Sequence, residues 1–262
     1  MERASEAFSH WYKRDGSPVY TIVGRNGKER NTTLADARKH GFAPSVTGII
    51  KMAYEERLEH YKQEQLLYHS LLTEKDENET DDFHMARIWS ASREHSRQAA
   101  ETGTAIHMAI EQHFARGGYD PALEEYVRGA VDLLGDRFPG VEWITEKSFC
   151  SVYGYGGKTD LHTRTRQGLV LDIKGREMST AQADSLATYH SHWMQLAAYR
   201  EGLNMPGARC GIVYVSRNVP GLARVVMVPE EKLEQGWEMF QALLAYWKAK
   251  NQFVWYPTPE EA

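Results

Sequence analysis

The 262-residue sequence is poor in cysteine, with Cys150 and Cys210 alone, and it has no long apolar run. Two thiols are too few for a disulfide framework, a four-cysteine iron–sulfur cluster or an all-cysteine zinc site. No stretch approaches the roughly 18 apolar residues of a membrane span. The first 20 residues are charged throughout and lack an apolar signal-peptide core. We therefore expect a cytoplasmic protein with no iron–sulfur cluster and no membrane partner.

The sequence also lacks an excess of positive charge, since 31 Lys and Arg stand against 36 Asp and Glu, a net charge of −5. This balance argues against a protein that binds nucleic acid nonspecifically over its whole surface. The acid is concentrated in residues 51–150, with 20 acidic and 11 basic residues, whereas residues 1–50 have 5 and 8 and residues 151–200 have 4 and 6. A local positive groove is compatible with this distribution.

The N-terminal part predicts a hairpin followed by a helical extension. Residues 18–34 are rich in β-formers around an Asn-Gly turn. Pro44 and Ser45 are typical of a helix start, and the apolar residues that follow predict a helix over 46–53. Residues 51–100 have a polar, helical pattern interrupted by an acidic loop at 73–82. We take residues 1–100 as an N-terminal extension.

Residues 101–262 predict an α/β domain, a mixed sheet with helices packed on it. The pattern begins with an amphipathic helix over 101–118 that Gly117 and Gly118 end. The segment YGYGG (153–157) is predicted as a turn. We expect strands at 143–152, 158–166, 169–175, 209–217 and 223–229, and further helices at 124–138, 181–203 and 230–250.

Charged side chains at the predicted sheet centre carry the chemistry. Asp172 and Lys174 are two residues apart on a strand that follows an apolar run, so both project to one face. Asp160 lies on the preceding strand, and the meander can bring the two carboxylates together. Buried charges are costly unless something uses them. A hard cation such as Mg²⁺ or Mn²⁺ would use two carboxylates and a backbone carbonyl. The alternative is a structural Asp–Lys ion pair.

The surrounding pattern resembles the PD-(D/E)XK nuclease superfamily, in its RecB-like branch, which includes phage-type exonucleases, CRISPR adaptation nucleases and a mitochondrial genome-maintenance exonuclease. Four blocks match in order over about residues 102–203: GTAIHMAIE, GYGGKTDL, LDIKG and QLAAYREGL. The segment PSVTGII (44–50) is similar to an N-terminal block of the exonuclease-like members. The resemblance implies a restriction-endonuclease-like αβββαβ core over 101–262.

The resemblance also implies roles for single residues. Asp160 and Asp172 would ligate one or two Mg²⁺ or Mn²⁺ ions, with the Ile173 carbonyl and the His107 imidazole as further ligands. Lys174 would orient or activate the attacking water and stabilise negative charge. The third position of the motif is the shorter Asp172, where many relatives have Glu. The QxxxY residues of the following helix would contact DNA phosphates; they are Gln195 and Tyr199.

Further candidates have ordinary structural alternatives. Glu111 lies one turn after His107, and Glu146 lies on the first strand; each supports a metal or makes a surface salt bridge. Ser45 and Thr47 cap the helix or hold a DNA phosphate. Lys158 is a candidate DNA contact. Three aromatic residues are candidates either for stacking on bases or for packing in the core: Tyr54, Trp89 and Trp193.

We therefore expect a metal-dependent DNA exonuclease that acts on single-stranded ends in phage-type replication, recombination or repair. In the mitochondrial-type relatives a helical region before the core shapes a passage for one strand, and the resemblance implies the same role for residues 51–100 here. A phage recombination or single-strand-binding protein is a candidate partner. Two alternatives stay open: a noncatalytic DNA-binding protein on a nuclease fold, and an endonuclease of the same fold.

Overall fold

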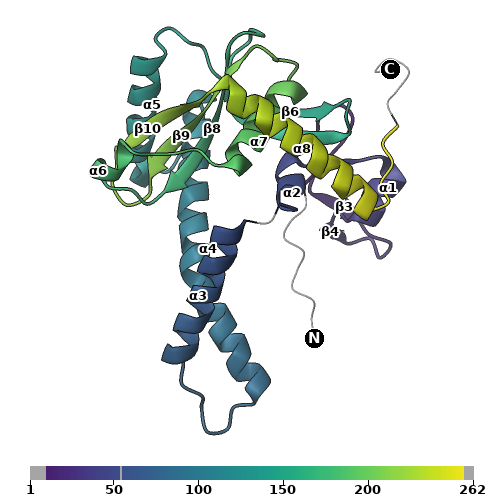
Figure 1. The fold of residues 1–262 in the computed structure, drawn as a ribbon, viewed down its shortest axis with the longest axis vertical. Helices are drawn as coiled ribbons and strands as arrows, with labels where there is room; N and C mark the ends of the chain where they lie inside the picture. The colour runs from purple at the N-terminus through teal and green to yellow at the C-terminus, as the bar shows by residue number, and fades with distance from the viewer. Residues whose placement is uncertain (1–9, 54, 257–262) are drawn as a thin grey trace.

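A five-stranded mixed sheet forms the centre of the computed structural model, which describes residues 10–53 and 55–256 (Figure 1). The strand order is β10-β9-β8-β7-β6, and β8 and β9 are the parallel pair in an otherwise antiparallel sheet. The strands are β6 (Ile144–Ser151), β7 (Tyr155–His162), β8 (Leu169–Arg176), β9 (Arg209–Ser216) and β10 (Ala223–Val228). The predicted meander and mixed sheet are confirmed.

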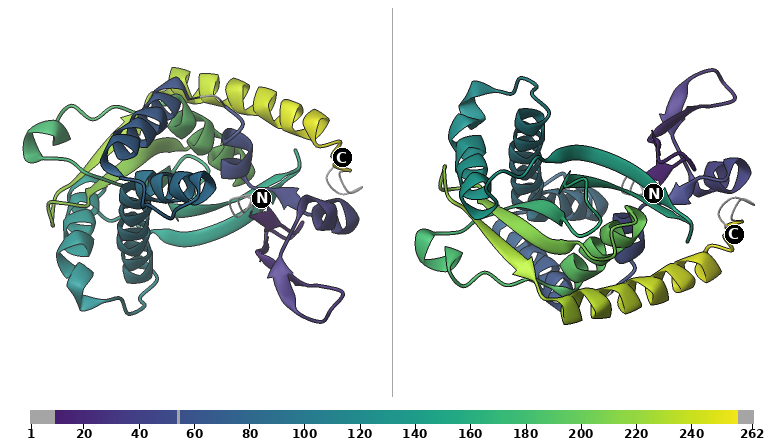
Figure 2. Two further views of the ribbon diagram at one scale, coloured as in Figure 1. Left: turned by 90° about the horizontal axis from the view of Figure 1, so that it is seen from below. Right: turned by 90° about the horizontal axis from the view of Figure 1, so that it is seen from above.

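Helices cover both faces of this sheet (Figure 2). On one face lie α4 (Asp81–Phe114) and α5 (Glu124–Arg137). On the other lie α7 (His190–Gly202) and α8 (Glu230–Lys250). The chain order α4, β6, β7, β8, α7, β9 is the αβββαβ arrangement, so the predicted restriction-endonuclease-like fold class is confirmed.

Alternation along β8 assigns its side chains to the two faces. Leu169, Leu171 and Ile173 belong to the apolar cluster beneath α4 and α5. Val170 belongs to the cluster beneath α7 and α8. Asp172 shares the parity of Val170 and therefore lies on the side of α7. The continuous apolar run leading into Asp172 thus reflects burial of both faces.

The N-terminal segment packs on the β6–β7 end of the sheet as small elements. β1 (Trp11–Tyr12) pairs with β2 (Pro18–Val19) and β5 (Ala43–Pro44), and the hairpin β3 (Thr21–Val23) and β4 (Glu29–Asn31) precedes α1 (Leu34–His40). The predicted hairpin over 18–34 is right for 21–31 only. Val19 is buried opposite Trp11, so burial draws β2 out of the hairpin.

The predicted helix at 101 is part of a much longer one. α4 begins at Asp81, where the Thr80 hydroxyl accepts from the Phe83 N–H at 3.3 Å, and runs 34 residues, about 50 Å. It crosses residue 100, the predicted boundary of the N-terminal extension, without a break. Its first half pairs with α3 (Glu56–Leu72), and the two project from the body as an arm (Figure 1). The predicted acidic loop is confirmed between the two helices.

The glycines at the start of β7 are packing residues rather than the predicted turn residues. The turn ends at Gly154, whose φ is +80°, and β7 already begins at Tyr155. A Cβ atom on Gly156 would lie 2.5 Å from the Tyr12 ring, and one on Gly157 would lie 2.8 Å from the Phe149 ring. The strand therefore needs glycine to accept neighbouring aromatic rings, and the predicted strand over 158–166 is displaced toward the N-terminus.

The predicted helix over 181–203 is divided into α6 (Thr180–Ala183) and α7, which starts at His190. The Tyr214 hydroxyl donates to the Ala187 carbonyl at 2.8 Å and holds the intervening segment against the sheet. The predicted helix over 46–53 is also shorter, because α2 (Val46–Ile50) ends at Lys51. Within the described residues, no helix combines the length and apolarity needed to cross a membrane.

Candidate metal and catalytic site

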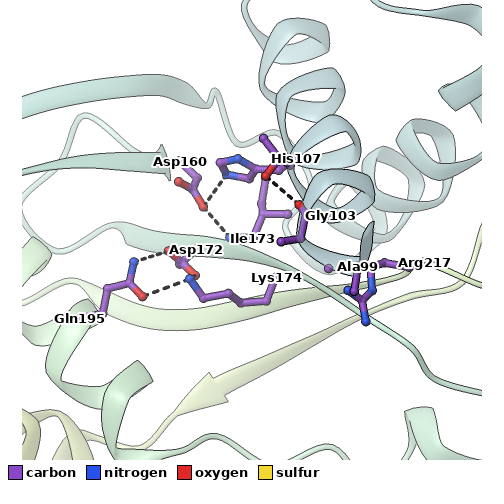
Figure 3. A pocket seen from close by; sticks show the side chains of 12 residues that line it. Ala99, Gly103, His107, Asp160, Asp172, Ile173, Lys174, Gln195 and Arg217 are labelled. Atoms are coloured by element: carbon purple, nitrogen blue, oxygen red, sulfur yellow. Dashed lines mark hydrogen bonds and ion pairs between the residues drawn. The ribbon is translucent and has the colours of Figure 1, made fainter. Parts of the chain in front are cut away.

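The site opens where β7 and β8 separate. These strands pair only through Leu161 with Leu171 and His162 with Val170. Beyond that point the Asp160 carboxylate enters the gap, and its Oδ2 accepts the Ile173 N–H at 2.6 Å (Figure 3). The carboxylate thus replaces a strand partner, which explains how a buried acid keeps a fixed position between two strands.

Two further candidate ligands come from the second half of α4. Ile106 and Ile110 are buried against the sheet, and this contact sets the rotation of the helix. His107 therefore faces Asp160, with Nε2 2.9 Å from Oδ2. Glu111 lies one turn further along the same face, with Oε1 3.7 Å from His107 Nε2.

Asp172 and Lys174 form a second group, bound to α7. Lys174 Nζ lies 2.8 Å from Asp172 Oδ2 and donates to Gln195 Oε1 at 3.1 Å. The Gln195 amide donates to Asp172 Oδ1 at 2.8 Å and to the Tyr199 hydroxyl at 2.9 Å. Both residues of the QxxxY pair are buried. Their contact with DNA phosphates stays a prediction, since their polar atoms hold the acid and the ammonium in place here.

The two groups share one pocket of about 340 Å³. Figure 3 shows Asp160 and His107 on one side of it and Asp172, Lys174 and Gln195 on the other. The remaining wall consists of small residues of α4 together with residues of the sheet and of the segment after β9; it comprises Ala99, Ala100, Gly103, Thr104, Ile173, Gly175 and Arg217. Small side chains on the helix leave room for a substrate beside the charged groups.

Burial and close charges shift the pKa values of the site. Burial raises the pKa of Asp172 to about 6 against the opposing effect of Lys174, and burial raises that of Glu111 to about 7. For His107, burial opposes the charged form, but Asp160 and then Glu111 outweigh it and raise the pKa to about 9. Strong pKa shifts among neighbouring buried groups are typical of functional sites.

Asp160 and Lys174 keep their charges. Burial disfavours ionisation of Asp160, but the His107 imidazole, Lys174 and the Ile173 N–H together hold its pKa below the usual value. Burial likewise disfavours the Lys174 ammonium, but Asp172 and Asp160 raise its pKa. At neutral pH the pocket therefore combines an ionised Asp160 with a protonated Lys174.

The donor set fits a hard divalent cation. One ligand atom each from His107, Glu111 and Asp160 lies within 4.8 Å of the others. Three buried ligand atoms of this site make ion-pair contacts but no aligned hydrogen bond among the described residues: His107 Nε2, Glu111 Oε1 and Asp172 Oδ2. Such atoms are costly to bury unless a ligand satisfies them. Glu111, a secondary candidate in the sequence, thus stands in this cluster, while Asp172 is engaged by Lys174 and Gln195.

Glu146 and Lys158 lie at the rim and bind each other. The Lys158 ammonium is 2.6 Å from the Glu146 carboxylate and 4.0 Å from Glu111. Glu146 is half-exposed and has a φ of +53° in the middle of β6, beside Asp160 on β7. A left-handed residue inside a strand is strained and turns its side chain away from the regular pleat. Their predicted roles, metal support for Glu146 and DNA contact for Lys158, stay predictions.

The PSVT segment is placed beside β7, where Ser45 makes a bridge to Gly156. Ser45 caps α2, because its hydroxyl accepts from the Gly48 N–H at 3.0 Å. Thr47 is exposed. Capping is thus the observed role of Ser45, and the phosphate contact of the pair stays a prediction. Trp193 is buried, Trp89 is about half-exposed on the arm, and Tyr54 lies outside the described residues.

Sequence reasoning missed Arg217, which lines the pocket from the segment after β9. No motif marks it. Its position follows from the pairing of the strands. In the parallel pair β8–β9, Ser216 stands opposite Arg176, so Arg217 lies at the same end of the strands as the residues that follow Lys174. Only the knowledge that β8 and β9 are adjacent and parallel would have located it.

No family model matches the chain, and no curated protein matches it either. Solved structures do match. A protein from Eubacterium rectale described as a candidate exonuclease is 12% identical over 58% of this chain and 69% of its own, with a TM-score of 0.42. An alkaline exonuclease from Laribacter hongkongensis is 13% identical over 57% of this chain and 89% of its own, with a TM-score of 0.36. These likenesses are weak, and we base the function on the geometry of the site.

Proposed function

We propose that this chain is a divalent-metal-dependent nuclease that hydrolyses DNA as an exonuclease, from single-stranded ends. The observation that carries the proposal is the meeting of an imidazole, two buried carboxylates and an ammonium in one open pocket, with a third buried carboxylate, that of Glu111, 3.7 Å from the imidazole. Phosphodiester hydrolysis requires neutralisation of the phosphate charge and an oriented water. Both requirements match this set of groups.

His107, Glu111 and Asp160 would hold the ion, and Asp172 and the Ile173 carbonyl would supply further oxygen ligands. When bound, Mg²⁺ or Mn²⁺ would neutralise phosphate charge and lower the pKa of water. The protein's part is to supply ionised ligands at fixed positions. Asp160 is fixed by the Ile173 N–H and Asp172 by Gln195.

Lys174 acts as a charge donor in this proposal rather than as a base. Its ammonium is buried, and the neighbouring acids raise its pKa, so it carries a proton at neutral pH. Asp172 and Gln195 orient it from two sides. It is therefore positioned to stabilise the negative charge that develops on the phosphate oxygens and to hold the attacking water by a hydrogen bond.

The preference for a single strand is supported by the arm. A pocket of about 260 Å³ between α3 and α4 contains Tyr61, Trp89, Lys62 and Arg93 and no acidic residue. The Arg93 guanidinium lies 4.4 Å from the centre of the Trp89 ring. Aromatic rings and cations together suit an unpaired base and its phosphate. We propose that the arm guides one strand toward the sheet.

The test is cleavage of end-labelled single- and double-stranded DNA with Mg²⁺, with Mn²⁺ and with chelator. We expect release of label from single-stranded ends that depends on the ion. Lys174→Ala and Asp172→Asn should abolish it while far-ultraviolet circular dichroism stays unchanged. Cleavage that survives both substitutions in a folded protein would overturn the proposal.

Closed circular single-stranded DNA separates an exonuclease from an endonuclease, since only the latter cuts it. A wild-type protein that binds DNA but cuts no substrate with either ion would instead identify the noncatalytic alternative.

A further inference from the structure

A second pocket of about 210 Å³ adjoins the catalytic one, and Ala99 and Arg217 line both. Its other walls come from α4 and from the two segments that follow β8 and β9. They are polar throughout: His95, Gln98, Thr102, Glu177 and Asn218. The proposed metal ligands do not line this pocket, so it is a neighbouring space on the same surface.

Arg217 stands in the wall between the two pockets and is firmly held. Its N–H donates to the Arg176 carbonyl at 2.9 Å, and its carbonyl accepts from the Tyr126 hydroxyl at 3.2 Å. Its aliphatic stem passes two glycines. A Cβ atom on Gly175 would lie 3.4 Å from Arg217 Cγ, and one on Gly103 would lie 3.8 Å from Cδ. The arginine stem therefore runs along these two glycines, and it lies beside Ala99 in Figure 3.

The guanidinium is largely buried and short of partners. The side chain is 18% exposed, and its Nε is buried with no hydrogen-bond partner among the described residues. Glu177 Oε1 lies 3.6 Å from Arg217 Nη2, and the same oxygen lies 4.0 Å from His95 Nε2. A carboxylate oxygen between two nitrogen groups marks a position suited to an anion. Glu177 is 55% exposed and follows β8, so its carboxylate can move out when a stronger anion arrives.

Asn218 adds an oriented donor. Its Oδ1 accepts from the Met178 N–H and from the Ser216 hydroxyl, each at 3.0 Å. With the oxygen engaged, the NH₂ group is the part of the amide left to a ligand in this pocket. Gln98 and Thr102 on α4 supply further hydrogen-bonding groups. A guanidinium fork with amide and hydroxyl donors is the usual protein surrounding of a phosphate.

We propose that Arg217 binds a phosphate of the DNA strand next to the scissile one, and that the second pocket is the subsite for that phosphate. The inference rests on the proposed nuclease function and names the group that sets the position of the strand in it. In the free protein Glu177 neutralises the guanidinium. The incoming phosphate displaces this carboxylate, and the strand is then fixed on both sides of the bond to be cut.

The experiment measures equilibrium binding of a labelled single-stranded oligonucleotide in chelator over a range of salt concentrations. Arg217→Ala should lower the affinity about tenfold or more, as expected for charge-assisted hydrogen bonds. It should also flatten the slope of log affinity against log salt by about 0.7, the value for one phosphate contact on a single strand. Arg217→Lys should keep the slope and recover only part of the affinity, because it keeps the charge and loses the fork.

Arg164→Ala is the matched control. Arg164 lies in the turn between β7 and β8, at the other end of β8, and its side chain is exposed. Removal of this charge should change neither affinity nor slope. Equal thermal unfolding of the variants checks that loss of the Arg217 stem has not altered the fold. Unchanged binding by Arg217→Ala, or an equal loss in Arg164→Ala, would overturn the inference.

Glu177→Gln provides a second, independent variant. Removal of the competing carboxylate should tighten binding several-fold in the wild-type background and have no effect in the Arg217→Ala background. The double-mutant cycle thus detects the exchange of carboxylate for phosphate. An equal effect of Glu177→Gln in both backgrounds would contradict it.

The phosphate has two possible sources, a terminal group or an internal backbone group, and the substrates separate them. Oligonucleotides with 5′-phosphate, 3′-phosphate or free hydroxyl ends are compared with a circle. If the phosphate is terminal, the wild type prefers one phosphorylated end, and Arg217→Ala removes that preference. If it is internal, Arg217→Ala weakens all four alike. Because binding is measured without divalent ions, failure of the nuclease proposal and failure of this subsite give different results.

Discussion

The two halves of α4 are one helix in two different environments. Residues 101–114 lie against the sheet, with Ile106, Ala109 and Ile110 fully buried and with two candidate metal ligands on the adjacent face. The first part of the helix, from Asp81 onward, projects from the body and packs on α3 around Trp89 and Arg93. Here large apolar side chains face solvent, and the same is true of α3; they include Leu71, Leu72, Phe83, Met85 and Trp89.

Ion pairs take the place of an apolar core at the end of the arm. Arg87 binds the Glu79 carboxylate through two nitrogens, at 2.7 and 2.9 Å, and donates to the Glu74 carbonyl. Lys75 binds Asp81 across the same loop. The Glu79 side chain is covered by Arg87, whereas Lys75 and Asp81 form an exposed pair, a type that contributes little stability singly. The arm is therefore held by weak, polar contacts, while the site is built on the half of the helix that the sheet makes rigid.

The largest expected difference between the halves is in stability. Ile110→Ala leaves a cavity under α4 and should lower the free energy of unfolding by about 2–5 kcal/mol. Met85→Ala, on the exposed half of the same helix, should change it by less than about 0.5 kcal/mol. Urea denaturation of both variants, followed by far-ultraviolet circular dichroism, measures the two values.

A loss of more than about 2 kcal/mol in Met85→Ala would show that the arm has a packed core after all. Equal losses of unfolding free energy in the two variants would show that both halves of α4 are packed alike. The slope of the urea dependence should stay the same in both, because neither substitution changes the surface exposed on unfolding to a large extent.

The features that the sequence predicted depend on local patterns, and those that it did not predict depend on contacts between residues distant in sequence. The three-strand meander, the helix predicted over 101–118 and the projection of Asp172 and Lys174 to one face follow from period, apolar runs and strand parity. These are local signals that the fold reinforces. The packing glycines of β7 and the break before α7 depend on Tyr12 and Tyr214, which are distant in sequence, so no local pattern contained them.

The site was partly predictable for the same reason. The approach of His107 to Asp160 was implied by the family resemblance and not by the residues alone. The place of Glu111 in the metal cluster follows from helical spacing once His107 is placed. The network of Gln195 was assigned to DNA, because a sequence pattern gives the facing helix but not the partner of each polar atom.

The same chemical change should affect metal binding on one half of α4 and not on the other. Glu111→Gln removes a candidate ligand and should lower Mn²⁺ affinity by about 100-fold, at least as much as loss of a group behind the ligands. Glu94→Gln, on the exposed half, should leave it unchanged. Isothermal titration of both variants with Mn²⁺ measures the difference, and it needs no DNA.

Stability provides the control for this pair. Glu111 is buried and its pKa is raised, so its replacement by glutamine should leave the unfolding free energy equal or higher at neutral pH. If Glu111→Gln keeps the wild-type Mn²⁺ affinity, Glu111 is not a metal ligand. A residue other than Glu111 would then be the third ligand beside His107 and Asp160.

The two regions should respond to pH in opposite directions. Burial raises the pKa of Asp172 to about 6 and of Glu111 to about 7, so the folded protein holds protons that the unfolded chain releases. Stability of the metal-free protein should therefore fall as pH rises from about 4 to about 7. The Arg87 guanidinium lowers the pKa of Glu79 to about 2, so the arm loses its contacts as pH falls below about 4.5.

Urea denaturation in chelator at pH 5 and pH 7.5 measures the first effect, and Asp172→Asn should reduce it. Hydrogen exchange over residues 73–90, corrected for the intrinsic pH dependence, measures the second between pH 5 and pH 3. Metal binding should release protons, because the ligands must lose them. Stability that rises with pH in the chelated protein would contradict the assigned direction.

The smallest expected effect tests whether the arm belongs to the substrate path. Trp89→Ala should weaken single-stranded DNA binding about fivefold to tenfold, the lower end of the range for loss of one stacked base, since Arg93 already covers one face of the ring. The cleavage rate at saturating DNA should stay unchanged, because the ring lines no part of the catalytic pocket. Tyr246→Phe, a change at an exposed aromatic residue on α8, serves as the control. An unchanged affinity in Trp89→Ala would show that the DNA strand does not contact this ring of the arm. The two halves of α4 would then differ in function as well as in packing.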